Sequence, residues 1–312
     1  MIVYDRGNWL SMVFRVHGSV VKHVWPRVVA VGVLATVLLV LQHQYPVLRR
    51  SLTTTPFLLT ALPLGIILGF RNSSSYERFW EGRKLWGSLV NASRSLVRQL
   101  DSLVIARKPE DKDAVDAFRR ETCHRLAAFA HALRMHLRGE RRLEELAPLL
   151  SAEEIASLAE EPSPPAAIVH RLGRDLRTAY EREWLESRHV QVVEGSLVAL
   201  TDVLGACERI KGTPTPISYV IFIHRAVAFY CFLLPFGVFD TVKELTPVVV
   251  FFVSYALFSL DAIGDELDDP FRPTPNGLPL DTISKNIEIY VRRRLGETKL
   301  PEAPRPVDGV LT

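Results

Sequence analysis

Residues 62–80, LPLGIILGFRNSSSYERFW, decide the fold because their character changes within one turn of helix. The first nine residues are all uncharged, and an arginine, an asparagine and three serines follow directly after Phe70. No glycine–proline signal marks a helix end at this change. The pattern therefore predicts one continuous helix, from about Pro56 to about Ile105, that leaves an apolar medium and enters water.

Four apolar runs indicate a protein that spans a membrane. Residues 28–48 and 51–70 contain no Asp, Glu, Lys or Arg, and a hydrocarbon core about 30 Å thick needs roughly 20 apolar residues of helix. The runs 226–239 and 245–260 are shorter and are flanked by charge. They would also suit buried core helices, but we interpret them as the third and fourth spans.

The bulk composition excludes few classes of protein. The 312 residues are 48% hydrophobic and carry a net charge of +3, which is too small to indicate a nucleic-acid partner. Cys123, Cys207 and Cys231 lack the spacing of a metal site or a disulfide framework, and this usage favours a reduced interior.

Charge and periodicity predict the orientation of the chain. Lys and Arg are concentrated before the first span and after the second, so the positive-inside rule places both termini in the cytoplasm. Trp9, Val13, Val16 and Val20 recur at helical spacing, which predicts a short helix lying at the membrane surface. The alternative for this segment is a soluble amphipathic helix.

Strand-like alternation is absent from the sequence, which predicts an all-α membrane protein with a helical cytoplasmic bundle. Ser151–Glu154 has the pattern of a capping box, and Ser163 followed by a proline predicts another helix start. The predicted parts are an interfacial N-terminal helix (1–27), spans 1 and 2 (28–71), the cytoplasmic bundle (72–213), spans 3 and 4 (214–263), and a cytoplasmic segment with an extended stretch, a short helix and a tail (264–312).

The opening stretch also carries a candidate ion pathway. Leu62, Ile66 and Phe70 lie at i, i+4 and i+8 on one helix face, with Gly65 and Gly69 beside them. Several copies around an axis would stack three apolar rings, and small residues would let the helices approach. Such a constriction can gate ions by dewetting. The alternative is that all three are ordinary core residues.

Below these rings, Arg71, Asn72 and Ser73 would face a water-filled vestibule. On this hypothesis the helix passes directly from apolar to charged residues because it leaves a dry neck and enters a water-filled cavity.

A second cluster contains the carboxylates Asp261, Asp265 and Asp268, which repeat at i, i+4 and i+7. Carboxylates on one helix face could hold Mg²⁺ or Ca²⁺, and a membrane enzyme acting on a diphosphate would use such a cluster. The alternative is that they end the fourth span and pair with nearby arginines, which we favour over a metal site.

Three further residues could be functional. Arg225 lies within the third span, where a charge usually has a partner, and Asp261 is the candidate. His124 and His131 could share a helix face and bind a metal, although no third ligand is close in sequence and a packing role is favoured. No phosphate-binding loop or nucleophile motif is present, so catalysis is not indicated.

Three ordered blocks resemble the bestrophin family, specifically its bacterial branch. They are GFRNSSSYERFWEGRKLWGSLVNASRSLVRQL (69–100), ACERIKGTPTPISYVIFIHRAVAFYCFLLPF (206–236) and SLDAIGDELDDPFRPTPNGLPLD (259–281). The resemblance covers nearly the whole chain. It implies a homopentameric ion channel with four spans per subunit in a bacterial inner membrane, and a single axial pore lined by the second span.

By the family pattern, Leu62, Ile66 and Phe70 match the three apolar neck positions. Animal members conduct chloride, whereas bacterial relatives tend to favour monovalent cations, so the resemblance implies a preference for cations such as sodium. The implied partners are other copies of the chain, membrane lipid and permeant ions. The alternatives remain a Mg²⁺-dependent membrane enzyme and a non-conducting membrane scaffold.

Two departures from the family affect these expectations. Animal bestrophins carry an acidic calcium clasp after Pro-Phe-Gly, but here Pro270 and Phe271 precede RPTPN, so we expect no calcium site and no other cofactor. The family's cytosolic pore exit falls near residues 186–190, where Arg188 and His189 stand in place of a small apolar residue. A ring of positive charge there would repel cations, against the expected selectivity.

Overall fold

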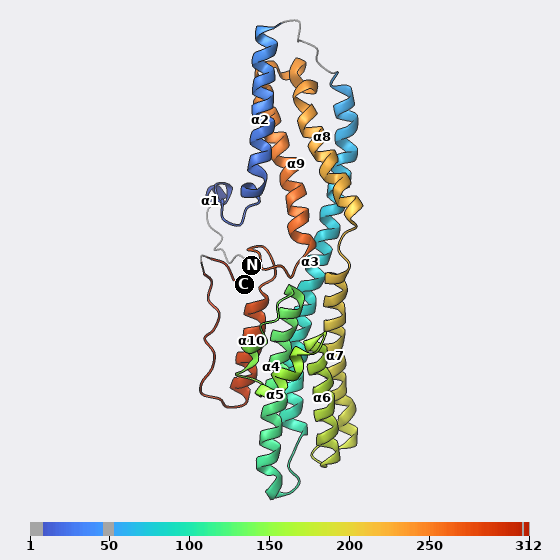
Figure 1. The fold of residues 1–312 in the computed structure, drawn as a ribbon, viewed down its shortest axis with the longest axis vertical. Helices are drawn as coiled ribbons and strands as arrows, with labels where there is room; N and C mark the ends of the chain where they lie inside the picture. The colour runs from blue at the N-terminus through green and yellow to red at the C-terminus, as the bar shows by residue number, and fades with distance from the viewer. Residues whose placement is uncertain (1–8, 46–52, 308, 312) are drawn as a thin grey trace. The chain divides into compact units, whose positions relative to one another are not determined.

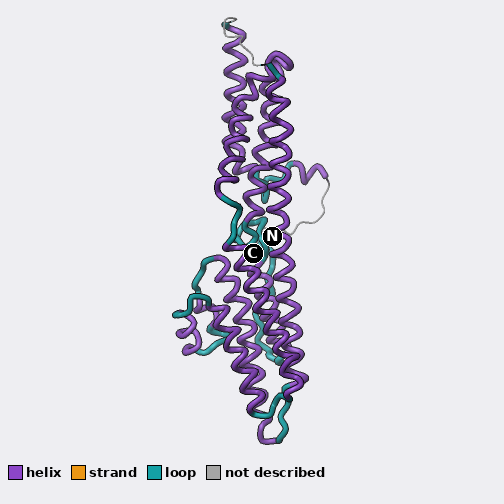
Figure 2. Tube along the Cα trace, turned by 90° about the vertical axis from the view of Figure 1, so that its right-hand side faces the viewer, coloured by secondary structure: helices purple, strands orange, loops and turns teal. Residues whose placement is uncertain are grey.

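The computed structural model describes residues 9–45, 53–307 and 309–311, and this part of the chain is helical apart from one isolated β-bridge between Val307 and Val310 (Figures 1 and 2). The α-helices are α1 (Trp9–Val13), α2 (Val21–Gln44), α3 (Thr55–Leu103), α4 (Lys112–Arg138), α5 (Ala152–Ala159), α6 (Pro164–Glu181), α7 (Ser187–Gly212), α8 (Ile217–Val242), α9 (Thr246–Asp268) and α10 (Leu280–Arg294). Three short 3₁₀ turns are η2 (Pro109–Asp111), η3 (Leu143–Leu146) and η4 (Lys243–Leu245). The all-helical fold class is confirmed.

Helix α3 confirms the central prediction from the sequence. It continues for 49 residues through the change from apolar to polar residues, although Pro63 lies inside it. It starts one residue before the predicted Pro56 and ends two residues before Ile105. Residues 55–79 of α3 therefore belong to one compact unit of the chain, and residues 80–103 belong to the other.

The prediction for the N-terminal segment is wrong in its extent. Helix α1 ends at Val13, and the chain is not helical again until Val21; Gly18 in this connection adopts a left-handed conformation with φ 77°. Helix α2 thus begins well before the predicted boundary at residue 28. Residues 1–8 of the predicted interfacial helix, and the loop at 46–52, lie outside the described residues.

The chain divides into two compact units. Among the described residues, unit 2 comprises 9–45, 53–79 and 214–269, and unit 1 comprises 80–213, 270–307 and 309–311. The predicted division into membrane spans and cytoplasmic parts, with boundaries at 71/72, 213/214 and 263/264, stays a prediction, because the two units are defined by contacts within the chain.

Unit 2 is built from α2, the first part of α3, α8 and α9, with α9 packed against both α2 and α8 (Figure 1). Its core is apolar and comes from all four helices. The fully buried members are Val24, Val28, Val31 and Ala35 of α2, Leu68 of α3, Ile223, Val227 and Cys231 of α8, and Val250 of α9.

Unit 1 is a bundle in which α4 packs against α6, α7 and α10. The capping box at the start of α5 is confirmed, because the Ser151 hydroxyl accepts from the Glu154 N–H and the Glu154 side chain accepts from the Ser151 N–H. Helix α6 starts at Pro164 as expected, but Ser163 makes no capping hydrogen bond and donates to Glu208 instead.

By length and composition, four segments of the described chain could cross a membrane: α2, α3, α7, and the run of 52 residues that contains α8 and α9. Three of these overlap the four predicted spans. The sequence analysis places the residues of α7 in the cytoplasmic bundle, and Val193, Leu197 and Leu200 of this helix are buried within unit 1.

Candidate functional site

The three predicted neck residues lie on one uncovered face of α3. Leu62, Ile66 and Phe70 are 70%, 50% and 70% exposed, whereas Leu64 and Leu68 of the same helix are buried in the unit 2 core. The alternative that the three residues are core residues of a single subunit therefore does not hold for this chain. Their face is available for lipid or for another copy.

Gly237 differs from the two glycines beside the predicted neck residues. A Cβ added at Gly237 would overlap the ring of Phe57, so this glycine is required for close packing inside the chain. A Cβ added at Gly65 or Gly69 would meet nothing within 4 Å. Packing within one chain does not explain the small size of Gly65 and Gly69, which lie beside the exposed apolar face.

Directly after Phe70, Arg71 enters a buried ionic cluster. Its Nη1 lies 2.5 Å from Asp261 Oδ1, its Nη2 donates to Asp265, and both Arg71 and Asp261 are almost fully buried. His224 Nδ1 lies 2.7 Å from the other oxygen of Asp261, and its Nε2 lies 3.6 Å from Asp265. The cluster thus joins α3, α8 and α9 through charge-assisted hydrogen bonds.

This geometry corrects two predictions. Asp261 pairs with Arg71 and His224, whereas Arg225 is exposed and has no ion pair with a described residue, because successive helical positions point about 100° apart. Arg71 is turned into the unit and away from the face of Phe70, so it does not line a vestibule in this chain. Ser73 is exposed, and Asn72 is partly buried.

Close backbone approach allows the cluster to form. A Cβ at Gly264 of α9 would lie 2.7 Å from Asn72 Oδ1 and 3.3 Å from Arg71 Nε. Only glycine leaves room for these two side chains of α3 against α9. The sequence pattern contained this signal, since Gly264 lies between two of the aspartates, but spacing alone does not show which helix it faces.

The carboxylates do not form a metal site among the described residues. Arg71 takes the position between Asp261 and Asp265 that a cation would occupy. Asp268 is held separately, by Arg78 at 3.4 Å and by the hydroxyl of Thr215. No group of three or more His, Cys, Asp or Glu suited to a metal is found in the described chain.

Two of the histidines of α4, the predicted pair His124 and His131, contact carboxylates from the C-terminal part of the chain. His124 Nε2 lies 2.6 Å from Glu297, and His131 Nε2 lies 2.9 Å from Glu288. Each histidine therefore has its own partner, which agrees with the packing role favoured from the sequence.

The residues of the predicted cytosolic exit lie at the start of α7. Arg188 is 75% exposed and its Nη2 lies 2.5 Å from Glu186, which also pairs with Arg107 at 3.3 Å. His189 is partly buried, and its Nδ1 has no partner among the described residues. The negative charge of Glu186 therefore offsets part of the positive charge of Arg188 at the predicted exit.

Comparison with known proteins identifies the family. The profile of the Bacterial/Fungal Bestrophin protein family matches residues 1–293. The chain belongs to this bestrophin family. A bestrophin homolog from Klebsiella pneumoniae is 32% identical in sequence, and its crystal structure superposes with a TM-score of 0.82 over 88% of this chain and 100% of that one.

Relatives of this bestrophin carry channel names. Voltage-dependent anion channel-forming protein RSc3414 of Ralstonia nicotianae is 36% identical over 96% of both chains. Voltage-dependent anion channel-forming protein alr2987 of Nostoc is 37% identical over 90% of both. These similarities support a membrane protein that is an ion channel rather than an enzyme. They do not support the expected preference for monovalent cations, because both relatives are named as anion channels.

Proposed function

We propose that this bestrophin is one subunit of an oligomeric channel that conducts small monovalent ions passively along a central axis. The observation that carries the proposal is the uncovered apolar face of α3, formed by Leu62, Ile66 and Phe70. Copies of this face that met at an axis would form three stacked rings, and ions would cross them only when water fills the constriction.

The free space beside the two glycines of this face supports assembly around α3. Gly65 and Gly69 meet no atom of their own chain, so a neighbouring helix could approach closely there. The proposed stoichiometry is the homopentamer implied by the family resemblance. The proposed location is the bacterial inner membrane, with both termini in the cytoplasm.

The proposed pathway below the neck includes Ser73, which is exposed one turn after Phe70. The proposed exit includes Arg188 and His189, with the charge of Arg188 reduced by its ion pair to Glu186. We propose no cofactor and no calcium clasp, because the chain lacks an acidic run after Phe271.

Two sets of observations favour opposite signs for the charge of the permeant ion. The neck sequence resembles those of cation-preferring bacterial bestrophins, whereas Arg188 and the anion-channel names of the relatives favour anions. The reversal potential in a NaCl gradient distinguishes the two. A potential near that of sodium assigns cations, and one near that of chloride assigns anions.

The proposal is tested with the purified full chain in liposomes, together with particle images of the detergent-solubilised protein. We expect ion flux without added substrate and a ring of copies with α3 at its centre. A monomeric particle, or a ring in which Leu62, Ile66 and Phe70 face lipid, would overturn the proposal. Mg²⁺-dependent turnover of a substrate without ion flux would favour the membrane enzyme. Absence of both ion flux and turnover would favour the non-conducting scaffold.

A further inference from the structure

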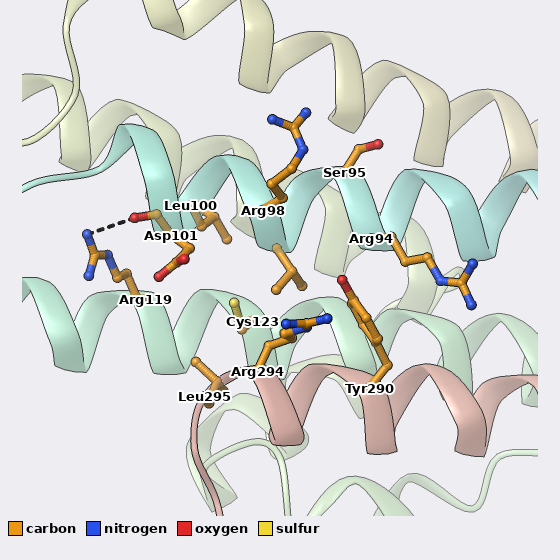
Figure 3. Close-up of a pocket in the computed structure, with 11 residues that line it drawn as sticks. Arg94, Ser95, Arg98, Leu100, Asp101, Arg119, Cys123, Tyr290, Arg294 and Leu295 are labelled. Atoms are coloured by element: carbon orange, nitrogen blue, oxygen red, sulfur yellow. Dashed lines mark hydrogen bonds between the residues drawn. The ribbon is translucent and has the colours of Figure 1, made fainter.

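We propose that unit 1 binds a small phosphate-bearing anion in a cavity between α3, α4 and α10, shown in Figure 3. The cavity has a volume of about 480 Å³, within the range of small-molecule sites. We call it the arginine cavity, after its four arginines Arg94, Arg98, Arg119 and Arg294. The inference goes beyond ion permeation and does not depend on it.

The arginine cavity carries more positive than negative charge. Arg94, Arg98 and Arg294 are exposed and form no ion pair with any carboxylate in the described part of the chain. Several other arginines of unit 1 have carboxylate partners. Examples are Arg125 with Glu154 and Asp175, Arg134 with Glu145 and Asp281, and Arg292 with Glu288 and Glu297.

Two of the unpaired guanidinium groups converge on one aromatic ring. The Cζ of Arg94 lies 5.7 Å from the centroid of Tyr290, and the Cζ of Arg294 lies 5.4 Å from it. Figure 3 shows the ring between the two groups. Each contact is a favourable cation–π interaction that leaves the guanidinium N–H groups free of carboxylate partners, so an anion at this end of the cavity would meet two charged donors. The planar guanidinium fork matches the oxygens of a phosphate, which indicates that chemical class.

The other end of the cavity would repel an anion. Asp101 is the only carboxylate among the described residues that line it, and Arg119 there already donates to the carbonyl oxygens of Asp101 and Val104 and pairs with Asp116. The phosphate is therefore placed at the Tyr290 end. The apolar side chains of Val97, Leu100 and Leu295 would contact an uncharged part of the ligand.

Cys123 also lines the cavity, but it is not a reactive group. Burial, reinforced by the charge of Asp101, raises the pKa of this thiol to about 12. The thiol is therefore neutral at physiological pH, and the site is one of reversible binding.

A buried polar atom adjoins the same two residues. A smaller cavity of about 170 Å³ shares Arg94 and Tyr290 with the arginine cavity and is also lined by Ser93. Ser93 is 1% exposed, and its hydroxyl has no hydrogen-bond partner among the described residues. Buried hydroxyls are nearly always satisfied in native proteins, so this group supports a polar ligand that extends past Tyr290.

The test is calorimetric titration of the purified full chain with inorganic pyrophosphate, with inorganic phosphate as the smaller probe and sodium chloride at equal ionic strength as the blank. We expect pyrophosphate to bind one site per chain and more tightly than phosphate. Arg94→Gln and Arg294→Gln should each weaken binding about 10-fold or more, since each removes a charged hydrogen-bond donor.

Arg293→Gln is the matched control, because Arg293 is exposed on the same helix and does not line the cavity. It should bind like the unmodified chain. Absence of pyrophosphate binding, or an equal loss in Arg293→Gln, would overturn the proposal. If a glutamine variant unfolds, Tyr290→Phe and Arg294→Lys give the same test with smaller changes, and unchanged binding in both would also overturn it. None of these readouts requires conductance.

Discussion

Arg71 lies next to Phe70 in sequence and is ion-paired to Asp261, with Nη1 2.5 Å from Oδ1 and both side chains buried. The last residue of the proposed neck is therefore followed at once by a side chain that is fixed to α9. If α9 moved relative to α3, this ion pair would have to break, or Arg71 would have to move together with Asp261. The buried ionic cluster thus fixes the position of the neck helix within its own subunit.

Replacing Arg71 by leucine should destabilise unit 2 by about 3 kcal/mol or more, because breaking a buried ion pair leaves an uncompensated charge, here on Asp261. The measurement is the unfolding midpoint of the detergent-purified protein. Arg225→Leu is the control, since Arg225 is exposed and unpaired among the described residues, and its effect should stay within about 0.5 kcal/mol. Equal losses in the two variants would contradict the assigned pairing.

Gly264→Ala should also destabilise the protein, by about 1–3 kcal/mol, because a methyl group there lies 2.7 Å from Asn72 Oδ1. Gly65→Ala is its counterpart, since the added methyl group meets nothing in the same chain. It should leave the folding of the subunit intact. If α3 helices of neighbouring subunits pack at Gly65, the Gly65→Ala variant should form a smaller fraction of assembled rings, measured by the mass of the solubilised complex. An intact Gly264→Ala protein would show that α3 and α9 are less close than described.

Acid should weaken unit 1 through Glu288 of α10. Burial alone would raise the pKa of this carboxyl, but hydrogen bonds from His131 and Lys285 outweigh it and lower the pKa from 4.5 to about 2. A carboxyl with a lowered folded-state pKa contributes stability above its unfolded value and loses it as the pH falls. The contribution of Glu288 should therefore be complete above pH 4.5 and disappear between pH 4.5 and 2.

The measurement is the unfolding midpoint of the full chain as a function of pH. Glu288→Gln should lower stability at pH 7 and flatten the pH dependence between 4.5 and 2. Glu302→Gln is the control, because Glu302 is 80% exposed and its ion pair to Arg305 spans 3.6 Å. A Glu288→Gln protein with an unchanged acid transition would contradict this role for His131 and Lys285.

The sequence was sufficient to predict the long helices but not the pairing of charges between them. Periodicity and uncharged length determine where α3 and α4 run, because both are local properties of the chain. The partner of Asp261 depends on which faces of α3 and α8 meet α9. His224 and Arg225 are adjacent in α8, so their side chains point about 100° apart around the helix. Hydropathy does not show which of the two faces Asp261, and in the structure it is His224.

The N-terminal prediction failed for a local reason. The apolar spacing of Val16 and Val20 predicts one helix, but both residues lie in the non-helical connection between α1 and α2, where Gly18 adopts a left-handed conformation. The arginine cavity was missed because its lining comes from α3, α4 and α10, whose side chains are distant in sequence. Its sequence signals are Arg94 and Arg98, four residues apart on α3, and the run of arginines that ends α10. Such runs are common at helix C-termini because basic side chains interact favourably with the helix dipole.

Replacing Phe70 by alanine should raise the single-channel conductance, because the smaller side chain widens and wets an apolar constriction. Phe252→Ala is the matched control: Phe252 lies on α9 and is 63% exposed, compared with 70% for Phe70, so both variants remove the same ring from a similarly exposed position. Currents are recorded from both variants in planar bilayers. If Phe70 lines the narrowest point, only its variant gains conductance, and Ile66→Ala should act in the same direction. Equal conductance of the Phe70→Ala and Phe252→Ala channels would show that both rings face lipid, and the proposed neck would then have to lie elsewhere.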